Sequence, residues 1–220
     1  MRLGVFAAAV LAAWTGALAP GLRAQPDPYT APYCEVPAGT KLLYSDRAYL
    51  IEPKPVDAPP LYFSYRILAP TGQSKHVKRR SQFLFDDGID QWDVTMGLSG
   101  LQNFWPLQPD SQLSLERLNR RTHATDQVSF VVLGLEPIGE GRNEYTSWEI
   151  RRIDQYSDGT SFYQFLWYAP EICALSAFTD SQHRVVNLLR VLKPGDHDYN
   201  RPLKVEKHRL YFADNGSLVK

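Results

Sequence analysis

Five carboxylates in the second half of the chain are the residues whose type could support catalysis. They are Glu136, Glu140, Glu149, Asp154 and Glu171. A glycoside hydrolase needs one carboxylic acid with a raised pKa and a second carboxylate across a cleft. Spacing along the chain does not show such a separation, and a glutamate that follows a proline, as Glu171 does, is more typical of a solvated turn. We therefore keep a glycan-active hydrolase as the alternative function and prefer a non-enzymatic one, with no catalytic residue assigned.

Other catalytic and metal-binding chemistry lacks the spacing that it requires. Asp196-His197-Asp198 offers a histidine beside two carboxylates, but no serine or cysteine nucleophile signature accompanies it. Four aspartates in residues 86–93 (DDGIDQWD) could supply oxygen ligands to calcium, yet their spacing differs from that of the helix-flanked calcium loop. We predict an acidic turn there, and neither a metal site nor a cofactor.

The cysteine inventory consists of Cys34 and Cys173. Two thiols in an exported chain usually form one disulfide, whereas a redox pair or a metal site would need closer cysteines. The sequence therefore predicts a Cys34–Cys173 disulfide that ties the start of the mature chain to its middle.

Residues 1–24 have the features of a secretory signal. Arg2 is followed by an apolar run over residues 3–18, and Leu22-Arg23-Ala24 provides a small-residue cleavage site. The apolar run is shorter than the ~20 residues that a membrane-spanning helix needs. We expect a periplasmic or secreted protein of about 196 residues that is not an integral membrane protein.

The charge of the chain argues against nucleic acid as a partner. Lysine and arginine number 24, as do aspartate and glutamate, and loss of Arg2 and Arg23 with the signal leaves 22 against 24, a formal charge of −2. Phosphate binding requires a broad basic surface that such a chain lacks. The basic residues 75–80 either mark an anionic partner or form a charged edge strand, and we favour the edge strand.

Hydrophobic alternation with a period of two predicts β-strands along most of the chain. It is clearest in residues 161–168 (SFYQFLWY), where both faces carry aromatic side chains, and in residues 61–68, 127–135 and 145–153. Residues 111–121 and 184–192 fit either a strand or a one-sided helix, and we favour strands because each follows a turn. Residues 97–100 (GLSG) are expected to form a loop.

These elements predict a mainly β fold, an antiparallel curved sheet or half-barrel with few or no helices beyond the signal peptide. After the signal come a proline-rich N-terminal arm over residues 25–35 and a single β domain over residues 36–220. Residues 62–67 and 145–150 share Tyr, Ser and Ile at the same spacing. Two similar meanders would explain this echo, and so would chance.

Two short motifs resemble those of uncharacterised exported bacterial β-proteins. They are residues 104–107 (FWPL) and residues 165–171 (FLWYAPE), and the likeness extends over about residues 101–192. That group is similar in fold to the half-barrel carriers that handle lipoproteins and lipids in the periplasm. The group usually has glycine where this chain has Cys173, and the resemblance implies no catalytic residue.

An antiparallel sheet curved around an apolar interior could bind a lipid or another apolar ligand. Six aromatic residues are the candidates for lining such a site: Phe63, Tyr65, Trp148, Phe162, Phe165 and Trp167. The same residues could instead fill the core, since large aromatic side chains are commonly buried. An envelope protein that docks on the basic segment or the proline-rich arm is the other expected partner.

Overall fold

The structure is a computed structural model that describes residues 30–58, 61–68, 74–80, 92–96, 98–139 and 141–219. The predicted signal sequence, residues 25–29 of the proline-rich arm and residues 86–91 of the four-aspartate segment lie outside these residues, whereas residues 92–93 belong to a strand. Within the described part of the chain, no helix is both long and apolar enough to cross a membrane.

Eleven strands of the described chain form one antiparallel sheet, so the predicted mainly β fold is confirmed. In chain order they are β1 (Lys41–Tyr44), β2 (Ala48–Ile51), β3 (Tyr62–Leu68), β4 (Ser74–Arg80), β5 (Trp92–Met96), β6 (Gln112–Asn119), β7 (Thr125–Ile138), β8 (Tyr145–Gln155), β9 (Ser161–Ala169), β10 (Ala174–Thr179) and β11 (Val185–Leu192). Short helical segments are α1 (Leu98–Asn103), η1 (Gly141–Asn143) and η2 (Pro170–Ile172). A separate hairpin consists of β12 (Leu203–Glu206) and β13 (Arg209–Phe212).

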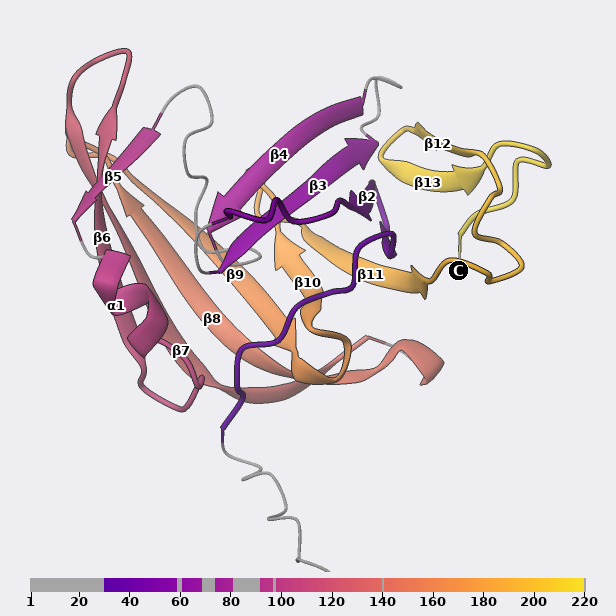
Figure 1. Cartoon of the computed structure of the whole chain (residues 1–220), viewed down its shortest axis with the longest axis horizontal. Helices are drawn as coiled ribbons and strands as arrows, with labels where there is room; N and C mark the ends of the chain where they lie inside the picture. The colour runs from indigo at the N-terminus through magenta and orange to yellow at the C-terminus, as the bar shows by residue number, and fades with distance from the viewer. Residues whose placement is uncertain are drawn as a thin grey trace, which may run out of the picture.

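The sheet joins two meanders of unequal length. Strands β1 to β4 form one and β5 to β11 the other, and β11 pairs antiparallel with β1 to connect them. The edges are β4 and β5, so the sheet stays open. It curves strongly, and β3 and β4 lie across the concave side from β8, β9 and β10 (Figure 1).

Alternation along each strand decides which side chains enter the concave side. Trp148 of β8 lies opposite Tyr168 of β9, and Ile150 opposite Leu166, so these four share one face. All four are at most 2 % exposed and belong to the main hydrophobic core. The period-two pattern read from the sequence therefore corresponds to an inner face and an outer face of the sheet.

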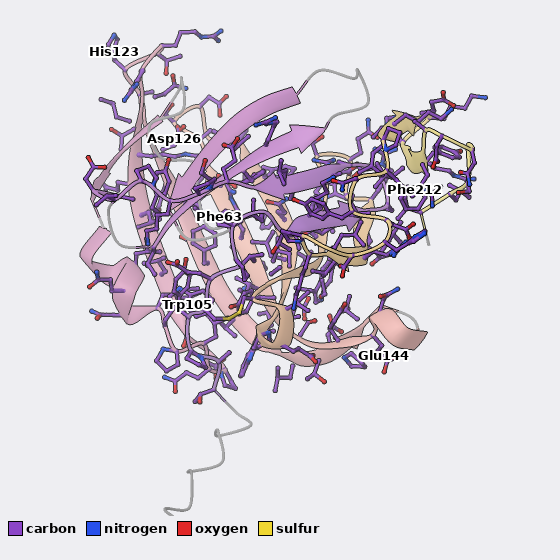
Figure 2. The ribbon with its side chains drawn as sticks, turned by 45° about the vertical axis from the view of Figure 1, so that its right-hand side comes forward. Phe63, Trp105, His123, Asp126, Glu144 and Phe212 are labelled. Carbon is purple, nitrogen blue, oxygen red and sulfur yellow. A yellow bond between two sulfur atoms is a disulfide. The ribbon has the colours of Figure 1, made fainter. Side chains whose placement is uncertain are left out.

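The N-terminal arm and the segment around α1 fill one end of the concave side. Ala31 forms an isolated antiparallel bridge with Leu107. The ring of Trp105 meets Tyr33 at 5.3 Å and Tyr168 at 5.1 Å between centroids, both edge to face. These contacts pack the arm against the sheet at the end where Trp105 is labelled in Figure 2.

The β12–β13 hairpin covers the outer face near the junction of the two meanders. Its core side chains pack against outward-facing residues of β1, β2 and β11. The members are Leu43, Ala48, Leu192, Val205, Leu210, Phe212 and Val219. The strands β1, β2 and β11 are therefore covered on both faces.

Both ambiguous segments are strands, β6 and β11, as predicted. The loop predicted over residues 97–100 is wrong in its described part, because Leu98 begins helix α1. Gly100 was interpreted as a loop residue, yet it lies inside the helix. A methyl group in place of its hydrogen would come within 3.3 Å of the Leu113 side chain, so glycine there allows α1 to lie close to β6.

The predicted disulfide is present between Cys34 and Cys173. Cys34 lies in the extended arm ahead of β1, and Cys173 follows η2 at the start of β10. The hydroxyl of Tyr168 lies 3.0 Å from the Cys34 sulfur. The bridge thus fixes the arm beside the aromatic cluster that closes the concave side.

Replacing both cysteines, Cys34→Ser with Cys173→Ser, is expected to lower the free energy of unfolding by about 4–5 kcal/mol, because the bridge closes a long loop. The two cysteines are 139 residues apart in sequence. Urea unfolding followed by tryptophan fluorescence measures the change. Reductant should lower the stability of the wild type to that of the variant and leave the variant unchanged; equal midpoints without reductant would contradict the prediction.

Candidate ligand site on the concave face

The concave side holds a cavity of about 120 Å³ where the two meanders face each other. Its lining residues are Leu42, Tyr44, Arg47, Tyr49, Phe63, Arg152, Gln164, Leu166, Ala174, Leu175 and Phe178. They come from β1 to β3 on one side and β8 to β10 on the other. The Tyr44 hydroxyl donates to the carbonyl of Leu175 at 3.0 Å and so connects the two sides. Eight of these eleven residues are apolar or aromatic, although polar atoms make up more than half of the exposed wall.

Arg47 brings a permanent charge to this small cavity. Its guanidinium lies 5.2 Å from the centre of the Phe178 ring and forms two hydrogen bonds with Asp46, at 2.7 and 2.6 Å. Burial by itself lowers the pKa of Arg47, but the hydrogen bonds and charge of Asp46 outweigh it and raise the pKa above its ordinary value. Arg47 therefore stays protonated and its charge is balanced by Asp46.

A larger cavity of about 770 Å³ adjoins the first. It is lined by Arg117, Asn119, Thr122, Asp126, Arg152, Asp154, Tyr156, Ser157, Asp158, Thr160, Phe162, Gln164 and Ser181. Arg152 and Gln164 line both cavities, so the apolar end and the polar end meet at these two side chains. Gln164 is held by donating from its Nε2 to the carbonyl of Thr179 at 2.7 Å.

An ion triad forms the polar wall of the larger cavity. Asp154 accepts from Nη2 of Arg117 at 2.8 Å and from Nε of Arg152 at 2.7 Å. The side chains of Arg117 and Asp154 are only 7 % and 2 % exposed. Buried charges of this kind need paired hydrogen bonds to offset their desolvation. The triad is therefore a fixed structure, with one positive charge in excess.

Asp126 supplies the opposing charge. It is 4 % exposed and its Oδ1 accepts from the backbone N–H of Ser157 at 2.8 Å. Arg117, Arg152, Asp154 and Asp126 sum to zero formal charge, and the exposed Asp158, which also lines the larger cavity, brings the total to −1. The cavity thus offers both donors and acceptors, and its charge does not favour an anionic ligand.

The structure brings four of the six predicted lining residues to the concave side. Phe63 lines the small cavity, and Phe162 lines the large one and stacks on His183 at 5.6 Å between centroids. Tyr65 and Trp148 face the same side but are 1 % exposed and lie in the core. These two residues therefore fill the core, which was the alternative to lining a ligand site.

Phe165 and Trp167 lie on the outer face and do not line the concave cavities. They alternate with Leu166 and Tyr168, which point inward, so the prediction had combined both faces of one strand. The two outer rings stack at 6.1 Å, and the Trp167 indole N–H donates to Glu136. Their packing is therefore with outer-face groups of β7 and β9.

The ion triad was not predicted from the sequence as part of a site. Arg152 and Asp154 continue the inward-facing set of Trp148 and Ile150 along β8, and two charges at such positions were the available signal. Arg117 lies on β6, and Asp126 of β7 pairs with it in the sheet. Only the tertiary fold shows that Arg117 and Asp154 meet.

The five carboxylates considered for hydrolysis are dispersed. Asp154 belongs to the ion triad, and Glu171 accepts from the backbone N–H of Thr146 at 3.0 Å. Glu136 and Glu149 lie on the outer face, where burial and then the charge of Glu136 raise the pKa of Glu149. Glu140 lies outside the described residues. Of the four that the structure describes, only Asp154 lines either of the two concave cavities.

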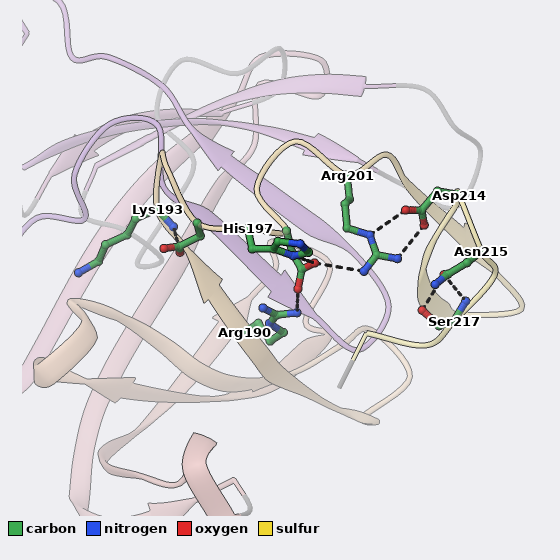
Figure 3. A network of polar contacts seen from close by, with 9 residues as sticks. Arg190, Lys193, His197, Arg201, Asp214, Asn215 and Ser217 are labelled. Atoms are coloured by element: carbon green, nitrogen blue, oxygen red, sulfur yellow. Dashed lines mark hydrogen bonds and ion pairs between the residues drawn. The ribbon is translucent and has the colours of Figure 1, made fainter.

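The predicted His–Asp pair belongs to a structural network instead. Asp198 accepts from Arg190 at 2.7 Å and from Arg201 at 3.2 Å, and it contacts a His197 ring that is 96 % exposed (Figure 3). These arginines and hydrogen bonds hold the pKa of the Asp198 carboxyl below its usual range. Within the described residues, no group of histidine, cysteine and carboxylate side chains could hold a metal ion.

Comparison of the chain with known proteins found no relative. Neither a family model, nor a curated protein, nor a solved structure matches the chain.

Replacing Asp154 with asparagine should lower the free energy of unfolding by about 3–5 kcal/mol, because the buried guanidinium group of Arg117 and the half-buried one of Arg152 lose their shared counter-charge. Urea unfolding monitored by fluorescence measures the difference. Glu206→Gln removes an exposed carboxylate and is the matched control, for which a change within about 0.5 kcal/mol is expected. Equal effects of the two substitutions would show that the triad does not support the fold.

The Glu149 carboxyl gives a pH-dependent prediction. Its pKa in the folded protein is raised, so its ionised form is disfavoured there and stability is lost as the pH rises through that pKa. Glu149→Gln should therefore raise the urea midpoint at neutral pH and have no effect below the ordinary glutamate pKa. The exposed Glu144→Gln serves as control; a stabilisation by Glu149→Gln that is equal at both pH values would refute the assignment.

Proposed function

We propose that this chain is an exported, non-enzymatic protein, periplasmic or secreted, that binds a lipid or another amphipathic ligand on the concave side of its sheet. The observation that carries the proposal is that a cavity lined mostly by apolar and aromatic residues meets a cavity lined mostly by charged and polar residues at Arg152 and Gln164. The disulfide and the predicted signal sequence support export. The resemblance to half-barrel lipid carriers points to the same ligand class.

Cavity size limits the apolar part of the ligand. Small-molecule sites usually measure about 300–1,000 Å³, and an apolar cavity of about 150 Å³ holds one benzene molecule. The cavity beside Phe63 and Phe178, at about 120 Å³, therefore takes a group smaller than benzene, such as the end of an acyl chain. The remainder of the ligand extends into the 770 Å³ cavity.

The charges of the cavity wall limit the polar part of the ligand. The formal charges of Arg117 and Arg152 are balanced by those of Asp154 and Asp126, so a ligand with a net charge would bring an uncompensated charge into the cavity. A zwitterionic or neutral polar group meets both the donors and the acceptors of the wall. We therefore expect a zwitterionic headgroup to bind at least as well as an anionic one with the same chains.

Filling the small cavity tests the proposal. Ala174 is 1 % exposed and lines the cavity, so Ala174→Leu should place its side chain where the apolar group binds. A short-chain phosphatidylcholine should raise the melting temperature of the wild type, because a ligand that binds only the folded state stabilises it. It should leave the melting temperature of Ala174→Leu unchanged. Ala213→Leu adds the same side chain at an exposed turn and should respond as the wild type does.

The far- and near-ultraviolet circular dichroism of each variant establishes that it folds before lipid is added. Phosphatidylglycerol with identical chains tests the headgroup. A wild type that shows neither a melting shift nor a co-purifying lipid by native mass spectrometry would refute lipid binding. A response of Ala174→Leu equal to that of wild type would place the ligand elsewhere.

A further inference from the structure

A third cavity, of about 360 Å³, lies on the opposite side of the sheet from the concave site. It forms between the outer face of β1 to β3 and the chain that enters the β12–β13 hairpin. Its lining residues are Lys41, Ala48, Tyr49, Leu50, Arg66, Asn200, Arg201, Pro202 and Leu203. Three of them are cationic and none is acidic.

Strand register explains why two of the cations flank an apolar floor. Lys41 of β1 lies opposite Leu50 of β2, and Leu50 lies opposite Arg66 of β3. Residues opposite one another in antiparallel strands share a face, so the three side chains form one row across the outer surface. The cavity therefore has an ammonium group on one side of Leu50 and a guanidinium group on the other.

The third cation is held in place by the hairpin. Arg201 donates to both oxygens of Asp214 at 2.8 Å and to Asp198 at 3.2 Å, as Figure 3 shows. Its guanidinium also lies 3.7 Å from the centre of the Phe212 ring. These contacts fix Arg201 before any ligand arrives, which reduces the entropy that binding would cost.

Lys41 is the cation of this cavity whose charge is not balanced. Its ammonium donates to the backbone carbonyl of Tyr199 and lies 4.3 Å from the centre of that residue's ring. Within the described part of the chain no carboxylate lies within ion-pair distance of it. Burial lowers the pKa of Lys41, and a bound negative charge would reverse that effect.

The charged groups around the cavity have an excess of one positive charge. Glu52 forms an ion pair with Arg66 at 3.4 Å. Asp198 pairs with Arg190 and Arg201, and Asp214 pairs with Arg201. Together with Lys41, this gives four cations against three carboxylates. All three carboxylates lie outside the cavity lining, so the cavity itself presents only positive charge.

We propose that this outer cavity binds a small organic carboxylate, with its negative group at Lys41 and its apolar body on Ala48, Leu50 and Pro202. The volume lies within the range of small-molecule sites, about 300–1,000 Å³. A single excess positive charge matches a monoanion, and the apolar floor favours a carboxylate with a hydrocarbon body over inorganic phosphate. The site is separate from the concave cavities and its existence does not depend on the proposed lipid binding.

Benzoate and its uncharged analogue benzamide form the matched pair of probes, because they have nearly the same shape and differ in charge. Isothermal titration should give one benzoate per chain, with benzamide bound at least about tenfold more weakly, since a charge-assisted hydrogen bond contributes about 1.5–3 kcal/mol. Inorganic phosphate is the third probe and should bind more weakly than benzoate.

Lys41→Gln should reduce benzoate affinity at least about tenfold, to the level of benzamide. Lys193→Gln removes an exposed lysine outside the cavity and should not change it. Because Lys41 also contacts Tyr199, Arg66→Gln provides a second test through a side chain that is 46 % exposed; it should weaken benzoate binding without changing the melting temperature.

Ala174→Leu separates the two sites, because it should abolish lipid binding and leave benzoate binding intact. Benzoate and benzamide of equal affinity, or a Lys41→Gln variant that binds benzoate as the wild type does, would overturn the proposal. Phosphate binding that equals or exceeds benzoate binding would overturn the assignment to an organic carboxylate. Loss of benzoate binding in Ala174→Leu would place the anion in the concave site and equally overturn it.

Discussion

The pairing of β1 with β11 is the constraint on which the concave site depends. Strands β5 to β11 alone form a simple meander, and β1 to β4 form another. Pairing of Lys41 with Leu192 and of Leu42 with Val191 joins them edge to edge. Because strands in a sheet twist relative to their neighbours, the joined sheet curves until β3 faces β8 and β9. The small cavity exists only between these facing strands.

Local sequence patterns predicted the strands because alternation is a local property. They separated β9 into two faces and favoured a strand for β11 from the turn that precedes it. They did not predict the long-range pairings, since nothing local in residues 41–44 identifies β11 as their partner. For the same reason the triad of Arg117 and Asp154, which are 37 residues apart in numbering, could not be assembled from the sequence. Helix α1 was missed because six residues are too few to show a helical period.

Disulfide and aromatic packing divide the concave side into a closed end and an open end. Around Cys34, Trp105 and Tyr168 the side chains interlock and leave the arm fixed across the sheet. Toward Asp126 the inward-facing positions become charged, and charged groups cannot pack as densely as aromatic rings without exact partners. The four aromatic candidates that face the concave side could not be sorted into core and lining from sequence alone, because burial depends on which end of the concave side each one reaches.

The short strand β2 shows how one element can serve both faces of the sheet. Its four residues alternate, with Ala48 and Leu50 forming the floor of the outer cavity and Tyr49 reaching the ring of Tyr65 at 4.6 Å on the inner side. Tyr49 lines both the inner and the outer cavity. An antiparallel sheet commonly exposes one face to solvent, but at β2 the hairpin covers the outer face and the opposite meander covers the inner one. This double coverage leaves a cavity on each side of β2, one with its arginine charge balanced and the other with its lysine charge unbalanced.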